Sequence, residues 1–401
     1  MLFSAFALLG LLPATFAAPS TGPLDTRAPL IQARSPSKTL SGKYIVKLKD
    51  GSTDASLSKA LGKLKAGHVY NAGGFKGFAA TLDTTSLEAI RNLPEVEYVE
   101  EDAVLSVTPD QTFKVAPRAT TTQANAPWNL ARISSHANGA GFYRYDTSAG
   151  QGTCSYIIDT GIYLAHPQFG GNAVWGANFA DTSNTDANGH GTAMAGVVGA
   201  IVLGVAKKTK LVAVKVFDAS GSGTTSGVIA GMNFVVTDKA TRGCPNGTTA
   251  NLSIGGAYSV SVNNAATNLV NSGVHVGVAA GSSNTNLANT SPASAPLVCT
   301  AGASNSADQV ASFSNYGPGL DIYAPGVNIQ VLWLGTGTNT ISGTSLSAAH
   351  ITGLGAYLYP LTGPIGGAAM CNYIKSIATV GVLTGVPSGT NNLLAYNGIV
   401  P

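Results

Sequence analysis

Three short segments of this chain carry side chains that could together perform nucleophilic catalysis. They span residues 156–162, 188–192 and 342–345, and in each one a glycine lies close to the residue with catalytic potential. A serine hydroxyl is a poor nucleophile at its own pKa, so it needs a neighbouring base, and that base needs an acid that orients it. The small neighbours let the backbone come close to a substrate. The segments therefore predict acyl transfer by a serine nucleophile, with Asp159, His190 and Ser345 as the three residues.

The elements around these residues should bring them together. Asp159 ends an apolar run, so we expect it at the carboxyl end of a central strand, where open α/β sheets bind ligands. His190 begins a segment of small residues that lets a helix pack closely against a neighbour. Ser345 stands at the start of a predicted helix over 346–359, which Pro360 would terminate. In this interpretation Ser345 attacks the acyl carbon, His190 takes and returns the proton, and Asp159 orients the imidazole.

The pattern of apolar runs predicts an α/β fold. From about residue 128, short apolar runs alternate with small-residue helical segments, which indicates a parallel sheet covered on both faces. Residues 41–104 form a separate compact unit in which strand and helix patterns alternate, as in a small α+β domain. The apolar runs are 155–158, 211–216, 251–254, 275–279 and 298–303, and the helical segments are 226–236 and 262–271.

The N-terminus and the cysteines indicate an extracellular protein. Residues 1–18 contain an apolar run and end on small residues, which predicts a secretory signal peptide. Residues 19–40 read as a flexible spacer and 105–120 as a linker that contains a maturation site. The four cysteines form no CxxC pair and lack clustered histidines, so two disulfides are favoured over a metal site. No later apolar stretch is long enough to predict a membrane span.

Charge is concentrated in the N-terminal part of the chain. All 5 glutamates and 13 of the 22 Lys and Arg residues precede residue 121, and after it 9 Lys or Arg face 8 Asp. Acid–base chemistry by glutamate is therefore excluded there, and the lack of a basic cluster argues against nucleic acid or an anionic membrane as partner. Among the other histidines, we expect His166 in a surface turn and His350 packed inside the protein.

These segments resemble those of the subtilases, and especially of secreted fungal enzymes of the proteinase K family. The resemblance extends over residues 121–398, with further matches at 124–128, 204–208, 291–294 and 312–317. It implies a subtilisin-like three-layer α/β fold with a central parallel sheet, formed by a peptidase domain over 121–401. Residues 43–102 resemble the subtilase propeptide, a ferredoxin-like α+β domain that helps folding and blocks the cleft until it is removed. Alignment puts this maturation near Thr120–Thr121.

The resemblance also implies binding sites. An extended peptide would lie between two segments by β-augmentation. A structural Ca²⁺ would be held by the carbonyls of Pro296 and Val298 and the carboxylate of Asp321, and no organic cofactor is implied. A weaker calcium site of the family is lost, because His136 and Val382 replace its oxygen ligands. The implied disulfides are Cys154–Cys244 and Cys299–Cys371, and the substrate segments are Gly221, Ser222 and Gly223 with Ser253, Ile254, Gly255 and Gly256.

Several positions depart from the family pattern. Ser282 replaces the asparagine whose amide stabilises the oxyanion, so the hole would be formed by Ser282 and Ser345. In this family, deleting that amide lowers turnover by about 10²–10³. Ala193 replaces a histidine, and Ala349 replaces a proline in the first turns of the helix that carries Ser345. These changes predict that the three catalytic residues are retained while the residues that stabilise the oxyanion and position the triad are altered.

The sequence thus favours a secreted, monomeric serine endopeptidase of reduced activity, acting on proteins or peptides and inhibited by its own propeptide. Two alternatives remain open: a catalytically impaired homologue with a binding or allergen-like role, and a peptide ligase or other acyl-transfer enzyme. Glycosylation sequons begin at Asn246, Asn251 and Asn289. We expect Asn251 to be unmodified because it would lie on the substrate strand, and we favour Asn246 because it lies in a loop.

Overall fold

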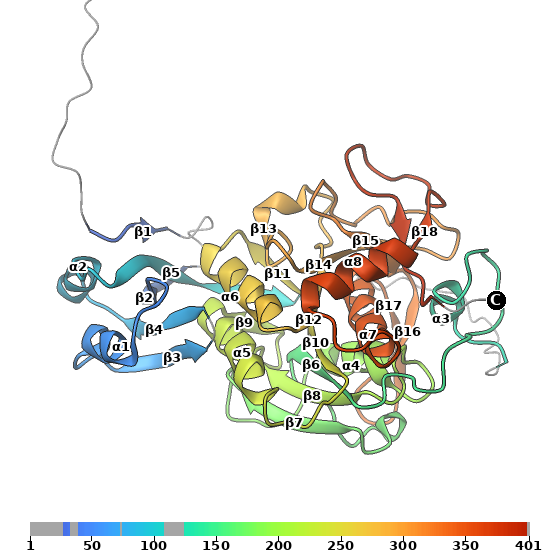
Figure 1. Cartoon of the computed structure of the whole chain (residues 1–401), viewed down its shortest axis with the longest axis horizontal. Coiled ribbons are helices and arrows are strands. Elements are labelled where there is room, and N and C mark those ends of the chain that lie inside the picture. Colours follow the sequence, from blue (N-terminus) through green and yellow to red (C-terminus); the bar gives the residue numbers. More distant parts are fainter. Residues whose placement is uncertain (1–26, 33–38, 73, 108–123, 399–401) are drawn as a thin grey trace, which may run out of the picture.

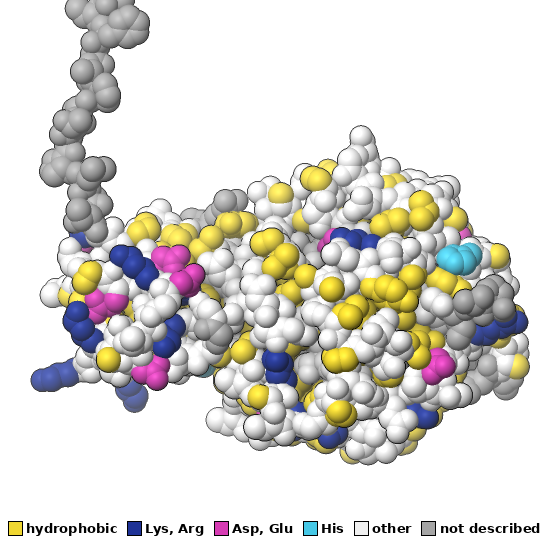
Figure 2. Space-filling view, in the orientation of Figure 1, with side chains coloured by type: hydrophobic (Ala, Val, Ile, Leu, Met, Phe, Trp, Pro, Cys, Tyr) yellow, Lys and Arg dark blue, Asp and Glu magenta, His cyan; other side chains and the backbone are white. Residues whose placement is uncertain are grey.

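Two units form the molecule, a small N-terminal one and a larger one that contains the three candidate catalytic residues (Figure 1). The structure, a computed structural model, describes residues 27–32, 39–72, 74–107 and 124–398. The expected signal peptide, most of the expected spacer and the expected maturation site at Thr120–Thr121 lie outside these residues. Charged side chains gather on the N-terminal unit, whereas the face of the larger unit shown in Figure 2 carries few.

The N-terminal unit is the small α+β domain that the sequence predicts. Its antiparallel strands lie in the order β5, β2, β4, β3, and β1 pairs in parallel with β5. Two short helices, capped by Thr53 and Asp83, pack on one face of this sheet around Val46 and Phe78. The elements are β1 (Leu30–Ile31), β2 (Thr39–Leu48), α1 (Asp54–Leu61), β3 (Ala66–Ala72), β4 (Phe75–Thr81), α2 (Thr84–Arg91) and β5 (Val96–Val107).

The larger unit contains a nine-stranded sheet that is parallel except for the strand at one edge. The strand order is β18, β19, β15, β14, β12, β10, β6, β8, β7. The strands are β6 (Thr153–Asp159), β7 (Ala173–Asn178), β8 (Lys210–Lys215), β10 (Gly247–Leu252), β12 (His275–Ala279), β14 (Cys299–Ser304), β15 (Ile322–Pro325), β18 (Thr379–Val380) and β19 (Leu393–Leu394).

Helices cover both faces of this sheet, which confirms the three-layer α/β prediction. Alternate residues of β6 point to opposite faces: Tyr156 and Ile158 pack in the core of α5 and α6, while Ile157 packs in the core of α4 and α7. The helices are α3 (Trp128–Arg132), α4 (His190–Gly199), α5 (Thr225–Asp238), α6 (Val260–Asn271), α7 (Thr344–Thr362) and α8 (Gly367–Ile377), with 3-10 turns η2 (Pro167–Phe169) and η3 (Leu287–Asn289).

Small residues let the central helix α7 lie close to the sheet. A Cβ at Gly277 of β12 would come within 2.3 Å of the Thr352 hydroxyl, so this approach requires glycine. The prediction that Pro360 ends the helix is wrong, because α7 continues to Thr362 with Pro360 inside it. A proline removes one N–H donor, and here the buried residues 357–359 keep the helix packed against the core.

The remaining strands form pairs outside the main sheet. They are β9 (Ser222–Thr224), β11 (Ile254–Ala257), β13 (Thr290–Ser291), β16 (Ile329–Leu332) and β17 (Thr338–Ile341). The N-terminal unit lies against α5 and α6, and β5 extends from it to pair with both β9 and β11 (Figure 1). The sequence placed the end of the N-terminal domain at residue 104, whereas its last strand continues to Val107. The two units therefore share one sheet.

Candidate active site

Asp159 and His190 form a buried, hydrogen-bonded pair. The Nδ1 of His190 lies 2.7 Å from Oδ1 of Asp159, and the two residues are 4% and 0% exposed. Asp159 is the last residue of β6, and His190 is the first residue of α4. This arrangement lets the carboxylate hold the imidazole ring in one orientation and stabilise its charged form.

A second aspartate, Asp186, fixes the backbone around this pair. Its Oδ1 accepts hydrogen bonds from the Thr160 hydroxyl at 2.9 Å and from Gly189 N at 2.8 Å. Its Oδ2 accepts two more, from the amide and the hydroxyl of Thr192. Thr160 follows Asp159, and Gly189 precedes His190. Asp186 therefore ties together the two segments that carry the acid and the base. No sequence pattern predicted this role for Asp186, although it is one of few aspartates after residue 121 and lies four residues before His190.

A buried lysine, Lys215, binds the backbone of the same segment through its ammonium group. Lys215 is 0% exposed, and its Nζ donates to the carbonyls of Thr160 and Phe217 at 3.0 and 2.7 Å. The same ammonium group lies 3.3 Å from Oδ2 of Asp181. Burial of an ammonium group is favourable only when its donors are satisfied, as they are here. Lys215 thus fixes the backbone directly after Asp159.

Ser345 is the second residue of α7 and lies beside Ser253, the residue that precedes β11. Its hydroxyl donates to the Ser253 carbonyl at 3.4 Å, and the Ser253 hydroxyl donates to the Ser345 carbonyl at 2.8 Å. Helices α7 and α4 pack against each other, and Leu346 and Ala193 belong to the same core cluster. The fold therefore brings the predicted nucleophile, base and acid onto three adjoining elements, and it joins the base and the acid directly.

The two predicted substrate segments hold a strand of the chain itself. β5 runs antiparallel to β9, with Leu105 opposite Gly223, and antiparallel to β11, with Val107 opposite Ile254. Ser253, which precedes Ile254, is the residue whose carbonyl accepts from Ser345. An extended peptide added between two short strands is β-augmentation, which uses backbone hydrogen bonds for affinity. The last residue of β5 therefore lies opposite Ile254, next to the Ser253 that contacts Ser345.

Comparison with protein families identifies both units. Residues 150–378 match the model described as the subtilase family, and residues 43–108 match the model described as peptidase inhibitor I9. The chain belongs to the subtilase family of serine endopeptidases. Its N-terminal unit is an inhibitor I9 propeptide domain.

Full-length fungal relatives agree with this family. The chain is 51% identical to the subtilisin-like serine protease AsES of Sarocladium strictum, over 98% of both chains. It is 50% identical to a cuticle-degrading protease of Metarhizium anisopliae, over 98% of this chain and 99% of the relative. Among solved structures, a cold-adapted subtilisin-like serine proteinase matches with a TM-score of 0.65 and 36% identity, over 69% of this chain and all of the other.

Within the described residues, no helix is long and apolar enough to cross a membrane.

In this subtilase, Ser282 bonds to Thr344, the residue that precedes Ser345. The Ser282 hydroxyl oxygen accepts from the Thr344 amide and lies 3.2 Å from the Thr344 hydroxyl, which in turn accepts from Gly281 N. These bonds join the segment after β12 to the start of α7. The short side chain of Ser282 thus holds Thr344, which is next to Ser345.

Burial lowers the pKa of two other histidines, His275 and His350, to about 4. His350 is buried as predicted, between the Leu346 carbonyl at 2.8 Å and the Asn129 amide at 2.9 Å. His275 is buried between two backbone carbonyls. The prediction of a surface position for His166 is wrong, because it is 3% exposed and caps η2 by accepting from Gln168 N. Both low-pKa rings are neutral packing groups at ordinary pH.

The cysteines form the pairs that the resemblance implied. Cys154 in β6 is bonded to Cys244, and Cys299 in β14 is bonded to Cys371 in α8. The sulfurs of Cys299 and Cys371 lie close to a carboxylate oxygen of Asp321, but disulfide sulfurs are not thiolate ligands. This cluster is therefore no transition-metal site.

The residues expected to bind calcium do not fit that ion. The Asp321 Oδ1 is 2.9 Å from the ammonium nitrogen of Lys375, and Oδ2 accepts from Thr300 N at 3.0 Å. The Pro296 carbonyl accepts from the Thr267 hydroxyl at 3.2 Å. Ca²⁺ requires six to eight oxygen ligands, whereas here a cationic side chain already lies on the one carboxylate.

Proposed function

We propose that this chain is a secreted serine endopeptidase made as an inactive precursor, in which Ser345, His190 and Asp159 form the catalytic triad. The single observation that carries the proposal is the path of β5, which lies between β9 and β11 as a peptide substrate would and ends beside Ser253. The buried Asp159–His190 pair at 2.7 Å supports it, because that pair supplies an oriented base.

The proposed reaction has two halves. The Oγ of Ser345 attacks the substrate carbonyl carbon while Nε2 of His190 takes its proton, and Asp159 stabilises the imidazolium through Nδ1. The tetrahedral intermediate collapses when His190 returns that proton to the leaving amine, which leaves an acyl ester on Ser345. A water molecule then attacks the ester with His190 again as base, which releases the acid product and restores the serine.

We propose that turnover is limited by Ser282. The oxyanion is stabilised by donors placed where its charge develops, and at this position the hydroxyl of Ser282 is engaged with Thr344. The backbone at the start of α7 supplies the other donors, helped by the positive end of the helix dipole. The site thus keeps its nucleophile and base while one oxyanion donor is weak.

Replacing Ser282 by asparagine is expected to raise kcat by roughly 10–100-fold, with little change in KM. The asparagine amide reaches further than the serine hydroxyl and adds a transition-state donor, whose deletion in this family costs about 10²–10³. The measurement is steady-state hydrolysis of a chromogenic peptide by the mature enzyme. Ser283→Asn, at the exposed neighbouring position, is the matched control and should leave kcat unchanged. An unchanged kcat in Ser282→Asn would show that oxyanion stabilisation does not limit this enzyme.

The direct test of the proposed function is hydrolysis by the purified mature protein. It should cleave a chromogenic peptide, and a reagent specific for active-site serines should abolish cleavage and label Ser345. A protein that reacts with the reagent but yields mainly transpeptidation products in the presence of added amines would instead be a ligase. A protein that neither cleaves nor reacts would be a binding protein on a subtilase fold.

We also propose that the protein is extracellular, glycosylated at Asn289 and monomeric. The disulfides Cys154–Cys244 and Cys299–Cys371 suit an oxidising compartment.

Asn289 is exposed at the end of η3, whereas the amide of Asn246 is half-buried and donates to the Gln151 carbonyl at 2.8 Å. Asn251 is 0% exposed, so a glycan there would not fit. The exposure of Asn289 supports it as the glycosylated residue, in place of Asn246, which was favoured from its position in a loop.

A further inference from the structure

We propose that the ammonium group of Lys375 takes the place of the structural calcium ion that the family resemblance implies, so that the fold of this subtilase does not depend on Ca²⁺. The proposal concerns the stability of the fold and is independent of the catalytic role proposed for Ser345. It rests on the side-chain contacts at Asp321, on the charges around that site, and on its place in the fold.

Both oxygens of the Asp321 carboxylate have partners from the chain itself. Lys375 Nζ lies 2.9 Å from Oδ1, and Thr300 N donates to Oδ2 at 3.0 Å. The side chains of Lys375 and Asp321 are only 29% and 21% exposed, so water screens their attraction less than it would at an open surface. A cation is therefore already present on the carboxylate.

The surroundings leave no negative charge for a second cation. The site borders a surface cavity of about 350 Å³, in which Asp321 is the one acidic lining residue and Lys375 the one basic residue among those that the structure describes. The lining is electrically neutral with the lysine and would carry two excess positive charges with Ca²⁺ added. Like charges at such a distance repel, and Ca²⁺ sites have acidic ligands that offset the charge of the ion.

Lys375 joins parts of the fold that an ion at this place would also join. It lies in the last turn of α8, where a positive charge also interacts favourably with the helix dipole. Four residues earlier in the same helix, Cys371 is bonded to Cys299 at the start of β14. Asp321 immediately precedes β15, the neighbour of β14. The ion pair and the disulfide thus clamp one face of α8 to two adjacent strands.

The position of the second, weaker calcium site of the family points the same way. His136, which replaces one of its oxygen ligands, has its Nδ1 2.8 Å from the Thr379 hydroxyl. The His136 ring also lies against the ring of Tyr396, with their centres 3.8 Å apart. Here too a contact between two side chains of the chain itself, His136 and Thr379, joins the segment around residue 136 to the segment that contains Val382.

The test is thermal unfolding of the full-length chain carrying Ser345→Ala, which prevents self-digestion and keeps the result independent of proteolysis. Its Tm should be the same within about 1 °C in EDTA and in millimolar CaCl₂. Replacing Lys375 by Met in this background keeps the apolar stem but leaves Asp321 without its cation. In EDTA this should lower Tm by about 3 °C or more, and CaCl₂ should restore part of the loss. Lys210→Met, at an exposed lysine at the start of β8, is the control and should change neither value.

Two results would overturn the proposal. One is a parent chain whose Tm falls by several degrees in EDTA and recovers with CaCl₂. The other is a Lys375→Met chain whose Tm equals that of the parent in EDTA. If Lys375→Met does not fold, equilibrium dialysis with ⁴⁵Ca²⁺ replaces the unfolding measurement. The parent chain and its Asp321→Asn variant should then bind the same number of calcium ions. If Asp321→Asn binds one ion fewer, calcium and not Lys375 occupies this carboxylate.

Discussion

Replacing Ser345 by alanine is expected to lower kcat by about 10⁶-fold and to leave the propeptide covalently attached. Removal of the serine or the histidine of such a triad costs about this much, because each residue acts only together with the other. His190→Ala should therefore cause a similar loss, and the double variant should lose little more. The measurements are hydrolysis of a chromogenic peptide and the intact mass of the secreted protein.

The matched control for this experiment is Ser376→Ala. Ser376 is an exposed serine near the end of α8, where its hydroxyl donates to the Tyr373 carbonyl at 2.7 Å. Its replacement should leave both kcat and maturation unchanged. A purified Ser345→Ala protein that keeps more than about 1% of the activity, or that loses its propeptide at the wild-type rate, would refute the assigned role of the serine.

The strand and helix ends that carry the three candidate catalytic residues were predictable because local sequence determines them. An apolar run that ends in a polar residue, such as 156–159, becomes a buried parallel strand, and its last residue lies where the carboxyl ends of the parallel strands meet. Likewise, glycine at position 189, where φ is +104°, makes the close turn into α4 possible. The alternation of apolar runs with helical segments predicted a parallel sheet covered on both faces, and the resemblance to the subtilases implied the three-layer fold.

What the sequence did not predict depends on contacts between distant residues. Lys375 meets Asp321 across 54 positions, and no local pattern marks a lysine that will lie on a particular carboxylate. Asp186 was missed because its role arises from the donors around it, which only the folded loop brings together. The end of β5 was missed for the same reason, since its last residues become a strand by pairing with β9 and β11.

The contact between the propeptide and the peptidase domain centres on two buried carboxylates of β5. Glu100 accepts from the Ser259 hydroxyl at 2.7 Å and from Ser261 N at 2.9 Å, at the start of α6. Asp102 accepts from the Ser226 hydroxyl at 2.6 Å and from its amide at 3.1 Å, at the start of α5. Carboxylates at helix N-termini satisfy free N–H groups and interact favourably with the helix dipole. These contacts hold the strand that leads to the active site.

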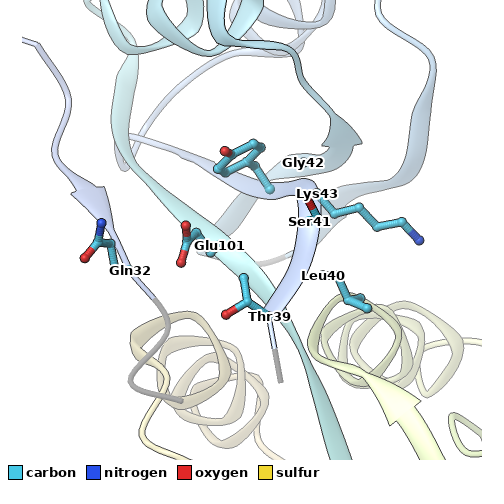
Figure 3. A pocket seen from close by; sticks show the side chains of 8 residues that line it. Gln32, Thr39, Leu40, Ser41, Gly42, Lys43 and Glu101 are labelled. Atoms are coloured by element: carbon cyan, nitrogen blue, oxygen red, sulfur yellow. The ribbon is translucent and has the colours of Figure 1, made fainter. Parts of the chain in front are cut away.

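Alternation along β5 provides a matched control. Residues 100 and 102 face α5 and α6, whereas Glu101 points to the other side of the strand and lines a hollow of about 440 Å³ within the propeptide (Figure 3). That hollow shares no residue with the catalytic pair or with the substrate segments. Glu101→Gln therefore removes the same charge from the same strand without touching the helix ends.

Glu100→Ala and Asp102→Ala are each expected to weaken inhibition by the separate propeptide, residues 27–107, by about 10–100-fold. Each change removes hydrogen bonds to a charged group, worth about 1.5–3 kcal/mol. The measurement is the inhibition constant, Ki, for the mature enzyme. Glu101→Gln should change Ki by less than about 2-fold, and circular dichroism should show that each variant propeptide is folded. Equal effects of all three changes would mean that the helix contacts do not hold the propeptide.

The pH dependence of this inhibition follows from burial. In the complex, burial raises the pKa of Glu100 and of Asp102. Release of the propeptide exposes both carboxyls to water, where the ordinary pKa of a carboxyl is about 4. The complex therefore binds protons more readily, so its affinity is highest below about pH 4 and falls as pH rises through the raised values. The double variant with Glu100→Gln and Asp102→Asn has no carboxyl to titrate at these positions, so its Ki lacks this pH dependence. The ratio of wild-type Ki to double-variant Ki should therefore rise between pH 4.5 and 8. Taking the ratio cancels every pH effect that the two propeptides share, and a ratio that stays constant or falls would show that proton binding at these carboxyls does not govern release.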